Sequence, residues 1–161
     1  TPEPVRPAAG GARGSYNILV TGVGGTGVVT IGNILGMAAH LEGRHVSVLD
    51  QTGLAQKYGA VMSHVQVADS PHALRATRIT DGGADLVLGA DLVTAASREG
   101  LRRLAAARSH VILDTETQVV SAFTRDGDLD FGTSSMVAAV RDIVGDAALD
   151  CVAANALATR L

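Results

Sequence analysis

The sequence predicts an α/β fold with a Rossmann-like, open and mostly parallel sheet that carries helices on both faces. Three observations support this class. Aliphatic runs at residues 16–21, 84–89 and 111–113 have the apolar character of buried parallel strands. The composition is 47% hydrophobic but only 2% aromatic, so the core must consist of small aliphatic side chains. A glycine-rich turn lies between the first predicted strand and a predicted helix.

The glycine turn has the sequence GVGGTG at residues 22–27, and a helix is predicted to follow it over residues 25–41. Apolar side chains recur in the helix at steps of three and four residues, and Gly43 has the position of a C-terminal cap. Such a turn lets a phosphate approach the backbone N–H groups that begin the helix. The candidate ligand-facing residues are Gly22, Gly24, Gly25, Thr26 and Gly27. The alternative is that the glycines only allow tight packing.

A second strand is predicted at residues 45–49, and Asp50 follows it. The separation between Gly27 and Asp50 is close to the roughly 20 residues expected between the last glycine and the ribose-binding acid of a dinucleotide site. The first part of the chain therefore has the spacing of a βαβ nucleotide-binding unit. An ordinary solvated carboxylate at a strand end explains Asp50 equally well.

A polar segment follows, and the second crossover helix of a doubly wound sheet is missing or reduced. Residues 51–59 are short and glycine-punctuated, and they lead into a strand predicted at residues 60–67. This stretch is expected to face the glycine turn. Its candidate site residues are Gln56, Lys57, Ser63 and His64. Lys57 can meet a phosphate or carboxylate as a point charge, or it can be a solvated loop residue. A hydrogen-bonded, partly buried histidine is the favoured interpretation of His64.

Further helices, and a hairpin or arm, are predicted in the C-terminal half of the chain. An amphipathic helix is expected at residues 98–108, a helix capped by Ser134 or Ser135, and a last helix at residues 147–161. Residues 121–130 are expected to form a hairpin or an arm. Carboxylates near the ends of these elements are expected to be mostly solvated. They are Asp81, Asp85, Asp91, Asp114 and Glu116.

Charge and cysteine content exclude several function classes. The net charge of −3 and the scattered 13 Lys and Arg residues argue against nucleic acid or an anionic membrane as a partner. Cys151 is the only cysteine, which excludes an intrachain disulfide and any thiolate-held zinc or iron–sulfur cluster within this chain. The five histidines show no metal-ligand spacing. The apolar stretch at residues 28–41 is interrupted and too short to span a bilayer.

Three segments taken together resemble a known family. They are ILVTGVGGTGVVTIGNILGMAAHLEG, VSVLDQTGLAQKYGAVMSHVQVA and ADLVLGADLV. They resemble the gamma-type domain of the 2-oxoacid:ferredoxin oxidoreductases, most closely the large fused indolepyruvate ferredoxin oxidoreductases of bacteria. The resemblance covers about residues 16–161, and residues 1–15 are interpreted as a linker from a preceding domain. Tyr58 departs from the family pattern, which usually has a small residue there. The chain also ends before the closing helices typical of this domain.

The resemblance implies part of a larger cytoplasmic enzyme that oxidatively decarboxylates indolepyruvate or another 2-oxoacid to an acyl-CoA. The implied cofactors are thiamine diphosphate, [4Fe-4S] clusters and coenzyme A, none of them firmly assigned to this segment. The implied partners are the thiamine-binding and ferredoxin-type domains of the same enzyme, ferredoxin itself, and further copies in a homo-oligomer.

The resemblance also assigns a role to the candidate residues. It places the following residues at the shared active-site region, with no catalytic residue in this segment: Gly24, Gly25, Thr26, Gly27, Gln56, Lys57, Ser63 and His64. Two other hypotheses stay open. One is an independent NAD-binding oxidoreductase or regulatory module that uses Gly22, Gly24, Gly27 and Asp50. The other is a docking domain whose glycines serve packing only.

Overall fold

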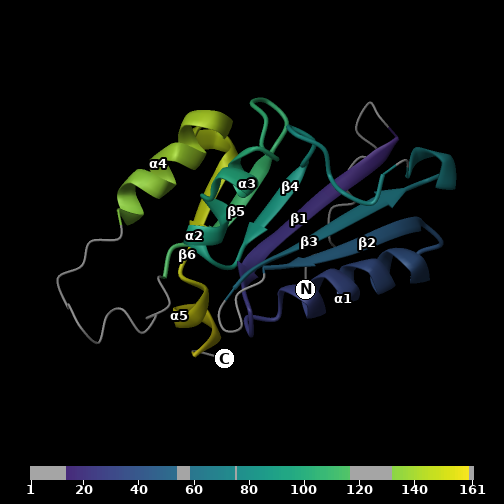
Figure 1. Cartoon of the computed structure of the whole chain (residues 1–161), viewed down its shortest axis with the longest axis horizontal. Coiled ribbons are helices and arrows are strands. Elements are labelled where there is room, and N and C mark those ends of the chain that lie inside the picture. Colours follow the sequence, from purple (N-terminus) through teal and green to yellow (C-terminus); the bar gives the residue numbers. More distant parts are fainter. Residues whose placement is uncertain (1–13, 54–58, 75, 117–131, 160–161) are drawn as a thin grey trace, which may run out of the picture.

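The computed structural model describes residues 14–53, 59–74, 76–116 and 132–159. Within these ranges the chain forms a six-stranded sheet of order β2-β3-β1-β4-β5-β6 (Figure 1). The strands are β1 (Ser15–Val23), β2 (His45–Thr52), β3 (Ala60–Ala68), β4 (Leu86–Gly89), β5 (His110–Asp114) and β6 (Leu149–Val152). β3 is antiparallel to both of its neighbours, and the other pairs are parallel. The predicted class is therefore confirmed.

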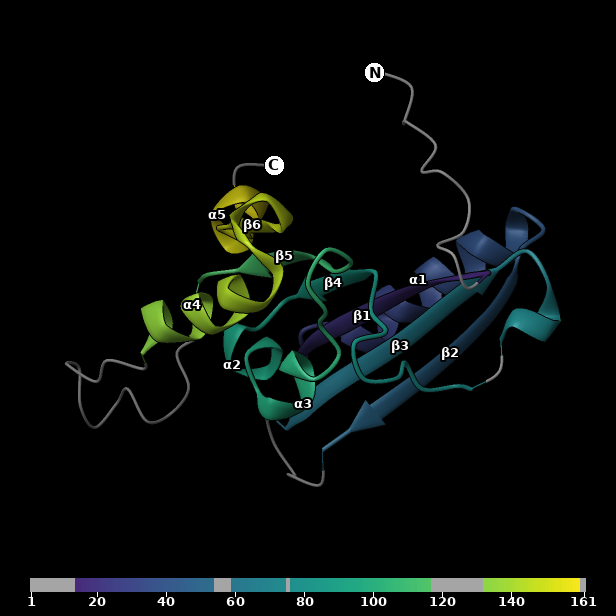
Figure 2. The same cartoon turned by 90° about the horizontal axis from the view of Figure 1, so that it is seen from above.

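Helices lie on both faces of this sheet (Figure 2). They are α1 (Val28–Leu41), α2 (Leu92–Ala95), α3 (Arg98–Leu101), α4 (Thr133–Val144) and α5 (Ala154–Ala158). α1 packs on one face, over β1, β2 and β3, whereas α2 packs over β1, β4 and β5 on the other. Across the described ranges, no helix combines the length and apolar character needed to cross a bilayer.

Small residues bring α1 unusually close to the sheet. The buried residues of this helix are Val28, Gly32, Gly36 and Ala39. A Cβ atom on Gly32 would lie 2.1 Å from Ser63 Oγ, and one on Gly36 would lie 2.8 Å from Val48 Cγ2. These contacts are too short for any side chain, so the two glycines set the helix-to-sheet distance.

The larger hydrophobic core lies on the opposite face. It joins side chains of β1, β3, β4 and β5 to residues of α2 and α4. The largest contributors include Leu19, Met62, Val87, Leu92, Leu113 and Val140. Asp91 caps α2 by accepting a hydrogen bond from the Thr94 N–H at 2.7 Å. The core side chains named above are all aliphatic or small, as the composition predicts.

The helix predicted at residues 98–108 is wrong, because α3 ends at Leu101. The carbonyls that would continue the helix are used elsewhere. Arg102 O accepts from the Gly82 N–H at 2.8 Å, and Arg103 O accepts from the Ala84 N–H at 3.0 Å. Pairing with a distant segment therefore overrides the local amphipathic pattern.

The last predicted helix is also wrong over most of its length. Residues 149–152 form the edge strand β6, which pairs with β5, and only Ala154–Ala158 is helical among the described residues. α4 begins at Thr133 with Gly132 as its cap residue, and Ser135 Oγ donates back to the Gly132 carbonyl at 2.6 Å. The predicted serine cap is therefore wrong. The hairpin or arm expected at residues 121–130 lies outside the described residues.

Candidate functional site

The glycine turn lies at the carboxyl end of β1, and it is shorter than predicted because the strand continues through Gly22 to Val23. Thr26 closes the turn. Its N–H donates to Val23 O at 3.1 Å, and its hydroxyl donates to the same carbonyl at 2.7 Å. α1 then begins at Val28, with Gly27 in the N-cap position.

The glycines of the turn have two different roles. A Cβ on Gly22 would lie 2.6 Å from both Thr26 Oγ1 and Val28 Cγ2, so Gly22 is required by packing. Gly25 and Gly27 have φ angles of +96° and +80°, and no atom lies within 4 Å of their Cβ positions. They are required by backbone conformation, and the space beside them is open. The packing interpretation therefore explains Gly22 but not the other two.

Several backbone N–H groups of the turn are available to a ligand. Among the residues that the structure describes, no acceptor is found for the N–H groups of Gly25, Gly27, Val28 and Val29. α1 also has no side-chain cap at this end. Free N–H groups at the start of a 14-residue helix attract anions, because they carry the positive end of the helix dipole. The arrangement can hold a phosphate or carboxylate.

The polar segment meets this turn at one described point. The Gly24 N–H donates to Gly59 O at 2.9 Å, so the start of the turn and the end of the segment are adjacent. Gln56 and Lys57 lie outside the described residues, so their predicted role stays a prediction.

Ser63 does not face solvent. It lies in the middle of β3, is fully buried, and points at Gly32 of α1. Its hydroxyl has no hydrogen-bond partner within the described part of the chain. Ser63 therefore forms part of the contact between α1 and the sheet, below the turn, and does not line an open surface.

His64 is fully buried on the opposite face of β3. Its Nε2 lies 2.8 Å from Gln51 Oε1, and its Nδ1 accepts from the Ile79 N–H at 3.4 Å. This places the proton on Nε2, since Nδ1 is an acceptor. Burial, and to a smaller extent the charges of Arg103 and Arg78, lowers the pKa of His64 to about 4. It is a neutral core histidine, as the favoured interpretation expected, and it is more buried than predicted.

Asp50 does not have the position of a ribose-binding acid. It lies inside β2, which continues to Thr52, and it pairs with Ser63 of β3. Since β3 lies between β2 and β1, Asp50 is separated from the glycine turn by an additional strand. Its exposed carboxylate lies beneath α1, with Oδ1 3.7 Å from the Cβ position of Gly32. The sequence therefore has the βαβ spacing, but β1 and β2 are not neighbours in the sheet, as they are in a dinucleotide site.

The carboxylates at this edge of the sheet are occupied by structural contacts. Asp114 is 8% exposed, and its Oδ1 accepts from the N–H groups of Glu116 and Ala154 at 3.0 and 3.3 Å. Asp91 is also 8% exposed and caps α2. The expectation of solvated carboxylates is therefore wrong for Asp91 and Asp114, whereas the Asp81 side chain is 52% exposed as expected.

A charged cluster lies on the face opposite α1. Arg103 is buried and forms ion pairs with Asp81 and Glu99, and Arg78 also pairs with Glu99. Hydrogen bonding to Arg102, at 2.7 Å, is the main cause that lowers the pKa of Asp81. These ion pairs hold the segment after α3 against the sheet, and the three arginines exceed the two carboxylates by one charge.

Sequence analysis missed one group of residues that could bind a ligand. Asn17 and Gln66 lie opposite each other on β1 and β3, at the far end of β1 from the glycine turn. The signal was present, because both amides stand between apolar residues within predicted strands. Within the described ranges, no group of three or more His, Cys, Asp or Glu side chains could hold a metal ion.

Comparison with known proteins decides the family. A model of the family described as pyruvate ferredoxin/flavodoxin oxidoreductase matches residues 17–140. The chain belongs to this family. The resemblance of the sequence to the gamma-type domain of the 2-oxoacid:ferredoxin oxidoreductases is thereby confirmed.

Individual relatives agree with this assignment. The chain is 38% identical over 80 residues to an indolepyruvate oxidoreductase subunit IorB of Pyrococcus horikoshii, which is 50% of this chain and 38% of that protein. It is 34% identical over 103 residues to the subunit of the same name from Methanothermobacter thermautotrophicus, which is 63% of this chain and 48% of that protein. The chain thus spans less than half the length of these curated relatives.

A solved structure shows the same fold. The pyruvate oxidoreductase subunit PORC of Thermotoga maritima aligns with a TM-score of 0.57 and 20% identity, over 91% of this chain and 66% of that chain. At this identity the likeness concerns the arrangement of strands and helices, and it agrees with the mixed sheet described above.

Proposed function

We propose that this chain is the gamma-type domain of an indolepyruvate or related 2-oxoacid ferredoxin oxidoreductase. The parent enzyme would oxidatively decarboxylate the 2-oxoacid to an acyl-CoA, with release of carbon dioxide and transfer of two electrons to ferredoxin. The family match over residues 17–140 is the observation that carries this proposal. The relatives named as indolepyruvate oxidoreductase subunits support an arylpyruvate substrate.

The glycine turn is the part of this chain that we assign to the shared active-site region. Coenzyme A and thiamine diphosphate both carry phosphate groups, and the unpartnered N–H groups at the start of α1 suit a phosphate. Gly24, Gly25, Thr26 and Gly27 would border this site. Gln56 and Lys57 would complete it from the neighbouring segment, whereas the buried Ser63 and His64 would support it without touching a ligand.

Other parts of the parent enzyme must supply its iron–sulfur clusters. A [4Fe-4S] cluster needs four ligands, usually cysteine thiolates, and Cys151 is the single cysteine of this chain. The proposed partners are therefore thiamine-binding and ferredoxin-type domains of the same enzyme, with ferredoxin as electron acceptor. We also propose a homo-oligomeric parent in the cytoplasm. Alone, this segment would be catalytically inactive.

Purification of the natural protein that contains this chain tests the proposal. Intact mass, iron content and thiamine diphosphate content are measured together with 2-oxoacid-dependent and CoA-dependent dye reduction, using indolepyruvate and pyruvate. We expect an iron- and thiamine-containing protein that reduces the dye, with higher kcat/KM for indolepyruvate. A small cofactor-free protein without this activity would contradict the proposal, and turnover by the isolated segment would contradict its inactivity.

The competing NAD-binding function loses its main support in the structure. Its acid, Asp50, is separated from the glycine turn by β3. Titration with NADH distinguishes the two functions. We expect Asp50→Ala to leave any binding of NADH unchanged, whereas micromolar binding that Asp50→Ala abolishes would favour the NAD-binding module.

A further inference from the structure

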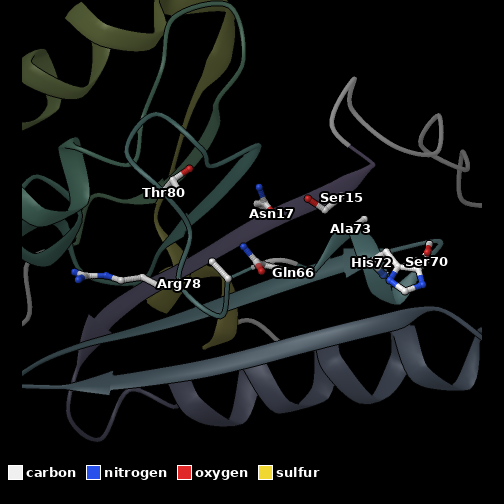
Figure 3. Close-up of a pocket in the computed structure, with 9 residues that line it drawn as sticks. Ser15, Asn17, Gln66, Ser70, His72, Ala73, Arg78 and Thr80 are labelled. Carbon is white, nitrogen blue, oxygen red and sulfur yellow. Dashed lines mark hydrogen bonds between the residues drawn. The ribbon is translucent and has the colours of Figure 1, made fainter.

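A cavity lies at the amino end of β1, away from the glycine turn and on the sheet face that α1 does not cover (Figure 3). Its volume is about 630 Å³, which is in the range of small-molecule sites. The lining comes from two residues of β1, one of β3 and six between β3 and β4, namely Ser15, Asn17, Gln66, Ser70, His72, Ala73, Ala76, Arg78 and Thr80. Figure 3 shows the two amides at the centre of this group.

Gln66 lines the cavity with an amide that lacks a partner. The residue is only 7% exposed, and no hydrogen bond is found for its side chain among the described residues. An amide group buried without a hydrogen bond costs folding free energy, so native proteins nearly always satisfy such a group with protein, water or ligand. This amide borders the cavity, so its donor and acceptor are open to a ligand or to water there.

Asn17 lies directly opposite Gln66 in the antiparallel pair, which places the two side chains next to each other. Its Nδ2 donates to Gly83 O at 2.9 Å, and its backbone N–H donates to Asp85 Oδ2 at 2.8 Å. These bonds fix the orientation of the amide. Its Oδ1 is enclosed and has no partner in the described part of the chain. Two neighbouring amides are thus incompletely hydrogen-bonded.

Two described lining residues, His72 and Arg78, have basic side chains, and no acidic side chain lines the described part of the cavity. Arg78 contributes its stem, while its guanidinium points away from the other lining residues and pairs with Glu99 (Figure 3). Asp85, which holds the backbone of Asn17, is itself paired with Arg108 at 2.8 Å. Hydroxyl and amide groups dominate the wall. A ligand group that meets the two amides therefore needs hydrogen-bond donors and acceptors rather than a charge.

We propose that this cavity binds an uncharged planar group with neighbouring N–H donor and acceptor atoms, namely a carboxamide or a nucleobase edge, through the amide of Gln66. A glutamine amide presents one acceptor oxygen and one NH₂ donor side by side, so it pairs with such an edge through two hydrogen bonds. Asn17 fixes the wall beside it. This site is separate from the glycine turn and from the reaction proposed above.

The test uses the natural protein that contains this chain, with nicotinamide and adenine as probes in saturation-transfer NMR and calorimetric titration. Methyl nicotinate and 9-methylpurine are the controls, since each keeps the ring but has no N–H donor. We expect millimolar or tighter binding of nicotinamide or adenine, and at least fivefold weaker binding of the corresponding control. The better of the two probes identifies the source of the edge.

Substitutions in the cavity lining test whether the probes bind in this cavity. Gln66→Leu is expected to weaken the better probe at least tenfold, and Ala76→Leu, which narrows the lining without touching the amides, to weaken it severalfold. The amide-to-leucine control Asn33→Leu lies on the exposed side of α1 and should leave binding unchanged. The proposal is overturned by a cavity that binds neither probe, by equal binding of the controls, or by binding that both cavity variants leave intact.

Discussion

The two ends of β1 carry candidate sites that are built in different ways. At the carboxyl end, the groups available to a ligand belong to the backbone, and glycines shape them. At the amino end, they are the side-chain amides of Asn17 and Gln66. A backbone site depends on close packing and on unusual φ angles, so one added carbon atom can damage it. A side-chain site can be removed by substitution while the fold is kept.

The largest effect is expected where α1 contacts the sheet and supports the turn. Gly32→Ala places a Cβ atom 2.1 Å from Ser63 Oγ, so helix and strand must separate. Overpacking of this kind costs roughly 1–3 kcal/mol, and we expect about 3 kcal/mol in urea unfolding. Asn33→Ala, one residue further along the exposed side of the helix, is the control and should change stability by less than about 0.5 kcal/mol. Equal stability of the two variants would contradict the packing account.

The second effect concerns His64 of β3, which pairs with the middle of β1 between its two ends. Its folded pKa of about 4 lies below the unfolded value of 6.5, so the unfolded chain binds the proton first as pH falls. Stability contributed by neutral His64 is therefore complete above pH 6.5 and is lost progressively toward pH 4. The expected loss is about 2 kcal/mol at pH 5. Urea unfolding at several pH values measures it.

His64→Gln is the matched variant. Its amide supplies a hydrogen-bond donor and an acceptor in place of the imidazole, but it does not titrate. Between pH 7 and pH 5 it should lose less stability than the wild type. If both lose the same amount, another group is responsible for the pH dependence.

A smaller effect is expected within the turn itself. Gly25→Ala meets no atom within 4 Å of its Cβ, so only the φ angle of +96° opposes it. A non-glycine residue in this conformation costs about 1 kcal/mol. Thermal unfolding should show this loss, while Thr30→Ala, on the exposed side of α1, should stay close to the wild type. A loss of stability above about 3 kcal/mol would contradict the open space that the structure shows around the Cβ position of Gly25.

The smallest effect is expected at the amino end. Gln66→Leu removes an amide without a partner, so no hydrogen bond is lost and an apolar group replaces a buried polar one. We expect stability within about 0.5 kcal/mol of the wild type, or slightly above it. A loss of 2 kcal/mol or more would show that the amide is satisfied in solution, and it would remove the contrast between the two ends.

Local patterns predicted the parts of the fold that local forces determine. The glycine turn, α1 with Gly43 after it, and the absence of a second crossover helix all follow from residue type and spacing. Strand order does not, because pairing of β3 between β1 and β2 depends on contacts between distant residues. The short β6 was missed for the same reason, since pairing with β5 rather than its own sequence makes it a strand.

The same distinction applies to the candidate site. The open glycines could be predicted, because glycine adopts a positive φ angle without the steric cost that other residues meet. The burial of Ser63 and His64 could not, because it depends on which face of β3 meets α1 and which meets the core. Asp50 had the expected spacing, but spacing along the chain does not reveal an inserted strand.

The most direct test of the account compares one turn variant with its control in the complete parent enzyme. Gly25→Val and Asn33→Ala are assayed for 2-oxoacid-dependent dye reduction over a range of CoA concentrations, after size-exclusion chromatography confirms equal assembly. The account predicts at least a tenfold lower kcat/KM for CoA in Gly25→Val and a value within twofold of the wild type in Asn33→Ala. Wild-type kinetics in a correctly assembled Gly25→Val enzyme would contradict a role of the glycine turn in the shared active site.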